Sequence, residues 1–244
     1  MVEPWFVAPP ESWGEGVIAL PPGESRHAAA VLRLSPGALV TVTDGRGRLA
    51  RCSLAEVNEA SALAAVVEDS HAERTGPEIV VYQAAAKGRK VDDMIERVAE
   101  VGVADVRIFN SERSVVRWDA AKSARLDERY AAIARSVAKQ SRSPFVMRTS
   151  AGLHWKELLA SVDSEPLALA LWERATEPLR DRLPQSASRL ALVIGPEGGF
   201  SDHEAGELTE RGASPVTLGE RILRTENAAL VAASAVLFHF GAIG

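Results

Sequence analysis

The pattern of hydrophobic and polar positions changes near residue 75. Before that point, short apolar runs alternate with turn residues. Residues 39–43 and 49–54 flank a tight, glycine-containing turn at 44–47, and residues 62–67 form another apolar run. Apolar runs on either side of such a turn are typical of antiparallel hairpins. The first part of the chain therefore predicts a small β-barrel or sandwich, with one short helix near residues 27–32.

From residue 76 onwards, apolar strand patterns alternate with helical spacing. Strands are expected at 79–86, 106–109, 167–171, 190–194 and 216–218, and helices at 92–102, 120–139, 201–212 and 225–240. Asp92 is expected to cap the first helix, and Ser201 with Glu204 forms a capping box. This alternation predicts a parallel sheet with helices on both faces. We expect an α/β protein of two domains, residues 1–75 and 76–244, joined by a linker at 71–77.

Composition excludes several classes of protein. The chain has 244 residues, of which 46% are hydrophobic and 25% charged, as in a globular domain with a real core. With Cys52 as the single cysteine, no intramolecular disulfide can form, and the five histidines lack metal-ligand spacing, so no metal is expected. No signal-peptide pattern is seen, and the apolar run 228–243 is shorter than the roughly 20 residues of a membrane span. We therefore expect a cytoplasmic protein without membrane association.

Charge is distributed unevenly along the chain. The net charge is −5, yet residues 76–150 hold 14 basic and 10 acidic side chains, and arginines also cluster between residues 26 and 51. Local basic patches attract a polyanion even on an acidic chain. Each arginine taken alone is equally consistent with a solvated surface. Charge by itself therefore leaves RNA binding open.

Two glycine-containing loops are the strongest chemical signal. There is no G-x-S-x-G elbow and no phosphate-binding G-x-x-x-x-G-K-[ST] loop, which excludes serine hydrolases and P-loop NTPases. The loop 195–200 (GPEGGF) follows an expected strand, where α/β sheets bind ligands. Pro196 lacks an N–H and Glu197 repels phosphate, so this loop suits an uncharged or cationic ligand. A plain strand-to-helix turn is the alternative reading.

The second loop, 218–227, also follows an expected strand, so the two loops could converge on one ligand. Ile222 and Leu223 would then wall an aromatic ring. Arg224 and Glu226 would supply charge, although taken alone they are better explained as an ion pair at a helix start than as catalysts.

These two loops resemble one known family. LVIGPEGGFS (192–201) and VTLGERILRTENAA (216–229) are similar to motifs of the bacterial 16S ribosomal RNA (uridine-N3) methyltransferases, which belong to the SPOUT, or trefoil-knot, superfamily. Shorter matches lie at His27 to Gly45, at Lys87-Gly, at 100–103 and at 111–114. The resemblance covers both halves and most of the chain.

The resemblance implies a fold, a cofactor and partners. It implies a small N-terminal PUA-like β-barrel that docks RNA, followed by a SPOUT α/β domain with a C-terminal trefoil knot. It also implies S-adenosylmethionine as cofactor, 16S ribosomal RNA within the 30S subunit as substrate, and a homodimer. The implied cofactor-binding residues are Leu171, Ile194, Gly195, Pro196, Glu197, Gly198, Gly199, Leu218, Gly219, Ile222, Leu223 and Arg224. The implied RNA-binding residues are Arg26, Arg33, Lys87, Arg113, Gln140 and Arg142.

The chemistry of a uridine N3 suggests catalytic roles. This nitrogen is a weakly acidic imide and must lose its proton for attack on a methyl group, which requires a base or a cation near the developing negative oxygen. Arg224 is the candidate cation, and Glu226 or Glu197 the candidate proton acceptor. The sequence does not decide between the two carboxylates.

Some positions depart from the family's pattern. Lys139 stands where the pattern has glutamate, and one residue is missing before Arg142. Arg97 replaces a lysine and Asn227 a threonine. The first departure bears on Gln140 and Arg142; Arg97 lies outside both glycine loops, and Asn227 is the last residue of the second.

The sequence argues against three other functions. A 2′-O-ribose methyltransferase of the same superfamily would carry an Asn-rich early motif that is missing here. An inactive RNA-binding assembly factor would have no need of two intact glycine loops. A nicotinamide-dependent oxidoreductase would carry G-x-G-x-x-G. The sequence leaves open which uridine is modified and whether free RNA or the assembled subunit is the substrate.

Overall fold

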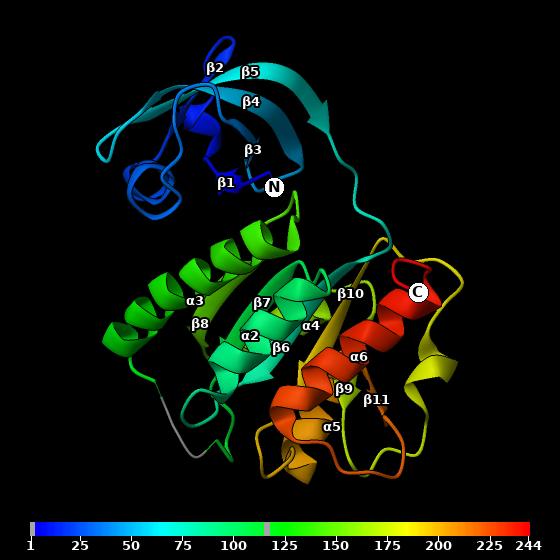
Figure 1. Ribbon diagram of the computed structural model, residues 1–244. Coiled ribbons are helices and arrows are strands. Elements are labelled where there is room, and N and C mark those ends of the chain that lie inside the picture. The colour runs from blue at the N-terminus through cyan, green and yellow to red at the C-terminus, as the bar shows by residue number, and fades with distance from the viewer. Residues whose placement is uncertain (1–2, 115–117) are drawn as a thin grey trace. The chain divides into compact units, whose positions relative to one another are not determined.

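The computed structural model describes residues 3–114 and 118–244, which form two compact units (Figure 1). The first unit contains the chain up to Glu73 together with Arg135–Val146. The second contains Arg74–Ala134 and Met147–Gly244. Helix α3 (Ala120–Ser141) therefore contributes its end to the first unit and its beginning to the second. The return of residues 135–146 to the first unit has no signal in the sequence.

The first unit is built on a five-stranded, curled sheet (Figure 1). Its strands are β1 (Trp5–Val7), β2 (Val17–Leu20), β3 (Leu39–Thr43), β4 (Arg48–Val57) and β5 (Ala62–His71), in the order β1-β3-β4-β5-β2. The expected hairpin is confirmed as β3 and β4, which pair antiparallel. Strands β1 and β2 were not predicted, and β5 runs to His71, so the linker is shorter than expected. The helical segment is also confirmed, as α1 (Pro22–Arg26) and a π-helical turn (His27–Val31).

The second unit contains a six-stranded sheet that is parallel throughout, which confirms the sequence prediction. Its strands are β6 (Glu78–Ala84), β7 (Asp105–Phe109), β8 (Arg148–Leu153), β9 (Ala168–Leu171), β10 (Arg189–Ile194) and β11 (Ala213–Val216), in the order β11-β9-β10-β6-β7-β8. Strand β10 thus lies between β9 and β6, and the carboxyl ends of β9, β10 and β11 meet at one edge.

Helices cover both faces of this sheet (Figure 1). They are α2 (Lys90–Glu100), α4 (Trp155–Asp163), α5 (Asp202–Glu210) and α6 (Thr225–His239), besides α3. Side chains of α4 and α5 pack with alternate residues of the strands, including Tyr82, Ala191 and Val193. Helices α2 and α6 pack against each other on the other face. In the part of the chain that the structure describes, no helix is long and apolar enough to cross a membrane.

Two expected boundaries are wrong, and each has a physical reason. The last strand is Ala213–Val216 rather than 216–218, because the chain turns away at Thr217, whose hydroxyl bonds to the backbone of Gly219. Helix α2 begins at Lys90 rather than being capped by Asp92. The Asp92 side chain is instead buried in the first turn, where it accepts a hydrogen bond from Arg129. The predicted capping box of α5 is confirmed: Ser201 Oγ accepts from Glu204 N at 3.1 Å, and Glu204 Oε2 accepts from Ser201 N at 3.0 Å.

Candidate functional site

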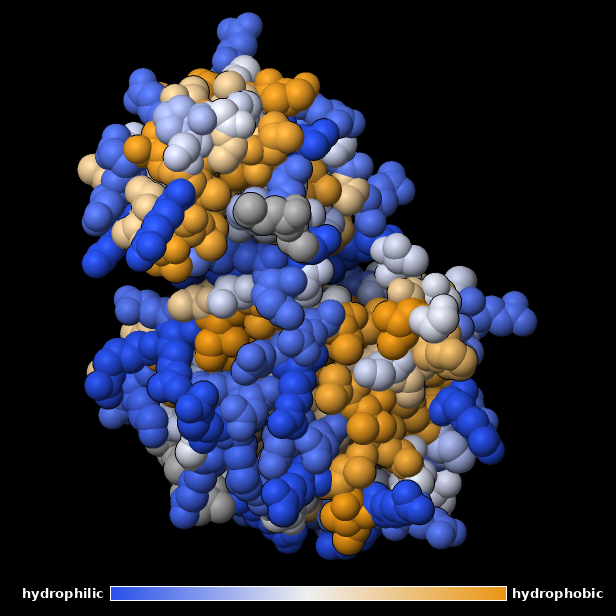
Figure 2. Space-filling model, in the orientation of Figure 1, coloured by the Kyte–Doolittle hydropathy of each residue, from blue (hydrophilic) through white to orange (hydrophobic). Residues whose placement is uncertain are grey.

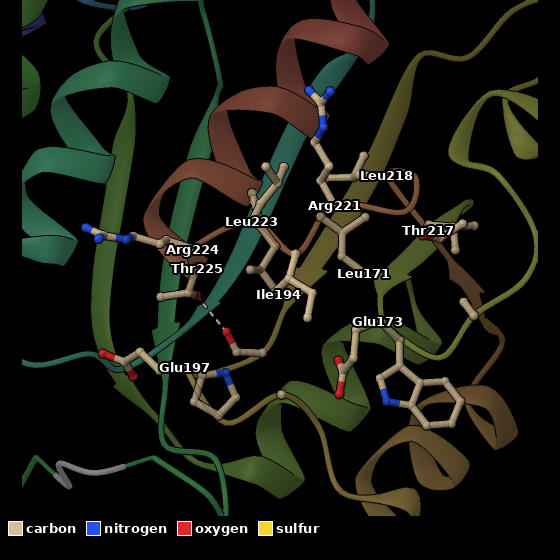
Figure 3. A pocket seen from close by; sticks show the side chains of 18 of the residues that line it. Leu171, Glu173, Ile194, Glu197, Thr217, Leu218, Arg221, Leu223, Arg224 and Thr225 are labelled. Atoms are coloured by element: carbon tan, nitrogen blue, oxygen red, sulfur yellow. Dashed lines mark hydrogen bonds between the residues drawn. The ribbon is translucent and has the colours of Figure 1, made fainter.

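A cavity of about 720 Å³ lies at the carboxyl ends of β9, β10 and β11, within the second unit (Figure 3). Three segments form most of its wall, at residues 171–175, 194–199 and 216–225. All twelve residues expected to bind the cofactor line this cavity. The structure thus brings together the two glycine loops, which lie about twenty residues apart in the sequence.

One buried hydroxyl connects the two loops. Thr225, the first residue of α6, is 7% exposed. Its Oγ1 donates a hydrogen bond to the carbonyl of Gly195 at 2.7 Å and accepts one from Gln83 Nε2 at 2.7 Å. Figure 3 shows the bond between Thr225 and the glycine loop beside the apolar side chains of Leu171 and Ile194. The end of the second loop is therefore fixed to the beginning of the first.

The interior of the cavity combines apolar walls with carboxylates. In Figure 3 the side chains of Leu171, Ile194 and Leu223 converge at its centre. The Glu173 carboxylate lies against Gly199: a Cβ at position 199 would be 2.5 Å from Glu173 Oε1. Gly199 also has φ of +67°, a backbone conformation that favours glycine, and a larger residue there would displace the Glu173 carboxylate.

An indole nitrogen in the lining has no partner. Trp172 Nε1 is buried and makes no hydrogen bond to any described residue, although buried donors are nearly always paired. The cavity is also lined by residues that were not among the cofactor-binding residues expected from the sequence, including Trp172, Glu173, Thr217, Arg221 and Thr225. The first two follow β9, and nothing in the sequence indicates that β9 lies between β10 and β11.

The three candidate catalytic residues differ in their position relative to the cavity. Arg224 and Glu197 line the cavity, whereas Glu226 does not. Burial raises the pKa of Glu197, whereas a hydrogen bond from Lys90 Nζ at 2.9 Å and hydrogen bonds from the backbone lower it. The hydrogen bonds outweigh the burial, so the pKa of Glu197 lies below its usual value. Glu226 lies in the first turn of α6, where its Oε2 is buried without a partner among the described residues.

A buried carboxylate fixes the segment 111–114 against the first glycine loop. Glu204 is 2% exposed and accepts hydrogen bonds from Ser111 Oγ at 2.8 Å and from Glu112 N at 2.9 Å. Arg113 Nη1 in turn lies 3.4 Å from the carbonyl oxygens of Gly198 and of Phe200. Arg113, an expected RNA-binding residue, thus lies at the edge of the glycine loop.

The other expected RNA-binding residues are divided between the units. Arg26, Arg33, Gln140 and Arg142 lie in the first unit and are exposed, whereas Lys87 lies in the second. Arg33 (φ 51°) and Arg142 (φ 56°) have a left-handed backbone, and no other described non-glycine residue has a positive φ. That conformation costs such a residue about 1–3 kcal/mol and tends to occur at functional sites.

The departures from the family pattern have local explanations. Lys139 Nζ pairs with the Glu24 carboxylate at 2.9 Å, within the first unit, so lysine has a partner at this position. Arg97 Nη1 on α2 donates to Asn227 Oδ1 on α6 at 3.1 Å. The two remaining departures therefore bind each other.

Across residues 3–114 and 118–244, no group of three or more His, Cys, Asp or Glu side chains is arranged to hold a metal ion. The donors that line the cavity are suited to an organic ligand.

Comparison with known proteins decides the family. The model of the RNA methyltransferase domain matches residues 73–237, and that of the RNA methyltransferase PUA domain matches residues 20–67. The chain belongs to the RNA methyltransferase family. Its first unit accordingly includes a PUA-type domain, as expected.

Several relatives of this chain bear the name ribosomal RNA small subunit methyltransferase E. The chain is 36% identical to ribosomal RNA small subunit methyltransferase E of Mycobacterium bovis, over 91% of this chain and 86% of the relative. It is 31% identical to that of Bacillus subtilis, over 88% and 87%. The solved structure of the Neisseria gonorrhoeae enzyme of that name, bound to S-adenosyl methionine, has a TM-score of 0.86 at 26% identity and covers 97% and 98%. A Legionella pneumophila protein in complex with SAM has a TM-score of 0.88 at 27% identity, with 98% of each chain covered.

Proposed function

We propose that this protein transfers a methyl group from S-adenosylmethionine to N3 of a uridine in 16S ribosomal RNA. The observation that carries the proposal is the cavity formed by both glycine loops at the carboxyl edge of the parallel sheet. Named relatives that cover most of the chain support the class of substrate. The N3 specificity rests on the resemblance of residues 192–201 and 216–229 to the uridine-N3 enzymes.

The cavity lining suits S-adenosylmethionine, which supplies an electrophilic methyl group on a positively charged sulfur. The apolar side chains of Leu171, Ile194 and Leu223 would hold the adenine ring. The Glu173 carboxylate would face the positive charge of the ligand, and the unpaired Trp172 Nε1 would find an acceptor. The bare backbone of the glycine loop lets the ligand approach closely.

The chain's own groups would then position and deprotonate the base. Arg224, at the N-terminus of α6 and at the cavity wall, would stabilise negative charge on a uracil oxygen as the N3 proton leaves. The lowered pKa of Glu197 and its pairing with Lys90 make that carboxylate a weak base. Glu226 has an Oε2 with no partner among the described residues but does not line the cavity, so both carboxylates stay candidates for the proton acceptor.

The RNA would be held by both units. We propose that residues 1–75 form an RNA-docking, PUA-like barrel and that residues 76–244 carry the methyltransferase activity. The left-handed backbone of Arg33 and Arg142 supports a role for these side chains in gripping phosphates. The substrate would be the 30S subunit in the cytoplasm, with Arg26, Lys87, Arg113 and Gln140 as further contacts.

The path of the chain supports the trefoil knot of the SPOUT superfamily. After the edge strand β11, the chain crosses the ends of β9 and β10, and Thr225 bonds to Gln83 at the end of β6. Residue Thr217 is also paired with the segment after β9, through the backbone of Glu177 and Leu179. A knot further requires that this segment pass through an earlier loop, which we propose on the resemblance to the SPOUT superfamily.

A homodimer through α6 would explain its composition. This helix is apolar around its whole circumference, which is typical of a helix with no solvent-facing side. Yet Val231 is 42% exposed and Phe238 is 70% exposed, and Ile222 just before the helix is 89% exposed. Figure 2 shows apolar side chains gathered over α6. We propose that a second copy covers this face, and Val231→Asp with Phe238→Glu should give a monomer in light scattering.

One experiment tests the reaction directly. The protein is incubated with methyl-labelled S-adenosylmethionine and 30S subunits that lack the modification, and the labelled nucleoside is identified after digestion. We expect 3-methyluridine. A labelled 2′-O-methyl nucleoside would contradict the N3 assignment. Failure to bind S-adenosylmethionine would contradict the proposal that this protein is a methyltransferase. Arg224→Ala should abolish turnover and leave cofactor affinity within a few-fold, whereas Glu226→Gln tests the proton acceptor.

A further inference from the structure

A second, smaller cavity lies in the second unit, apart from the large one. Its volume is about 160 Å³, and it opens between the loop that follows β6 and the beginning of α3. Lys87 and Arg89 contribute from the loop, and Lys122 and Arg129 from the helix. Trp118 and Tyr130 form its aromatic wall. Among these residues, only Lys87 had an expected role.

The lining of this cavity is strongly basic. The described residues contribute four cations and one carboxylate, that of Asp92. Asp92 is already bound by Arg129, so it does not neutralise the other three cations. Lys122 Nζ lies 5.7 Å from the centre of the Trp118 ring, which leaves its three N–H donors largely free for a ligand. Such a lining is complementary to an anion.

The size and the aromatic wall restrict the kind of anion. Pockets for whole organic ligands usually measure about 300–1,000 Å³, so this cavity accommodates a single chemical group. Trp118 and Tyr130 are 7% and 2% exposed, so their rings offer no free face on which a nucleobase could stack. A phosphate held by arginine and lysine fits the size, the charge and the donors.

The same loop borders both cavities. Lys87 and Arg89 line the small cavity, whereas Lys90 lines the large one and pairs with Glu197 of the glycine loop at 2.9 Å. A phosphate bound by Lys87 and Arg89 would therefore be held by a loop whose next residue, Lys90, belongs to the wall of the proposed cofactor site. RNA anchored there would have a neighbouring nucleotide within reach of that site.

We propose that this basic cavity is a binding site for one phosphodiester of the substrate RNA, next to the nucleotide that is methylated. The inference rests on the proposed function, because it presupposes an RNA substrate. Contacts to phosphate fix the position of the RNA and carry no base specificity. The site would thus set the affinity for RNA and leave the chemical step unchanged.

Two variants and a matched control test the proposal in the full-length protein. Arg89→Gln and Lys122→Gln each remove one charge from the lining. Arg125→Gln removes one from the exposed surface of the same helix, outside the cavity. Binding of a fluorescent oligouridylate is measured against salt concentration, and KM and kcat are measured with 30S subunits. Calorimetry with S-adenosylmethionine monitors the cofactor site.

We expect both cavity variants to raise the Kd for the oligouridylate and the KM for 30S subunits by about 3–10-fold, with kcat and cofactor affinity within twofold. Each should lower the slope of log Kd against log salt by about 0.7, the value for one phosphate of a single strand. Arg125→Gln should change neither. Equal effects of all three variants, or none from Arg89→Gln and Lys122→Gln, would overturn the proposal.

Phosphorus NMR with inorganic phosphate separates the two sources of a phosphate group. If the cavity variants lose inorganic phosphate but keep wild-type KM for RNA, the cavity serves a free anion and our proposal is wrong. The binding assay needs no turnover, so its outcome is independent of methyl transfer. If oligouridylate binding depends on Arg89 and Lys122 but no methylated product forms, the proposed methyl transfer is contradicted, whereas the binding of an RNA phosphate in this cavity is still supported.

Discussion

The hydroxyl of Thr225 offers the sharpest test of how the large cavity is assembled. It bonds to Gln83 Nε2 and to the Gly195 carbonyl, each at 2.7 Å, in a buried position. Valine keeps the shape of threonine and lacks the hydroxyl, so Thr225→Val leaves the Gly195 carbonyl without this partner and Gln83 Nε2 with its 3.3 Å hydrogen bond to the Ala84 carbonyl. An unsatisfied buried group costs about 1–3 kcal/mol, and we expect a loss of that size in the free energy of unfolding. For a protein of this size the melting temperature should fall by roughly 2–12 °C.

A double-mutant cycle shows whether the hydrogen bond is the cause. Gln83→Leu removes the amide that Thr225 satisfies, so in Gln83→Leu/Thr225→Val one unpaired group disappears together with its partner. Urea unfolding should therefore show a double variant that is more stable than the sum of the single losses by about 1 kcal/mol or more. Melting within about 1 °C of the wild type for Thr225→Val, or strict additivity in the cycle, would refute the reasoning.

Three further predictions concern other parts of the chain. Gly199→Ala strains a backbone with φ of +67° and displaces the Glu173 carboxylate from the cavity wall, so it should lower cofactor affinity about tenfold in calorimetry. The control Gly206→Ala, in open space on α5, should raise the melting temperature. Arg142→Gly relieves a φ of 56° and should raise stability by about 1 kcal/mol in urea unfolding, while the KM for RNA increases. Burial, with nearby carboxylates, raises the pKa of the Cys52 thiol to about 11. A thiol reagent at about pH 8 should therefore label it only after unfolding; rapid labelling of the native protein would show that the first unit opens readily.

Local sequence signals predicted the local features of the fold. The turn at 44–47 identified the β3–β4 hairpin, and the capping box at Ser201 and Glu204 identified the beginning of α5. Both features depend on residues close together in the chain. Strand β8 (RTSAGL) was missed because it lies at the sheet edge and lacks a buried apolar run. Asp92 was misassigned because a carboxylate near a helix start serves equally well as a cap or as the partner of a distant arginine.

Features that depend on strand order could not be predicted. The two glycine loops supply ten of the twelve residues named for the cavity, and Ile194 ends the strand before the first loop; Leu171, on β9, was named only from the family resemblance. Trp172 and Glu173 line the same cavity only because β9 lies between β10 and β11. Likewise, Arg97 and Asn227 are 130 residues apart in the sequence, and only the packing of α2 against α6 brings them together.

The order of segments around the large cavity has a consequence for biosynthesis. Its wall takes residues from β9, β10 and β11, and the clasp at Thr225 comes last. A nascent chain that has emerged only as far as β10 holds six of the 22 residues that line the cavity and cannot bind the ligand. Ligand binding stabilises only a state that contains the site. Stabilisation by the cofactor therefore begins only once α6 has left the ribosome, and until then the partly built sheet depends on its own packing or on chaperones.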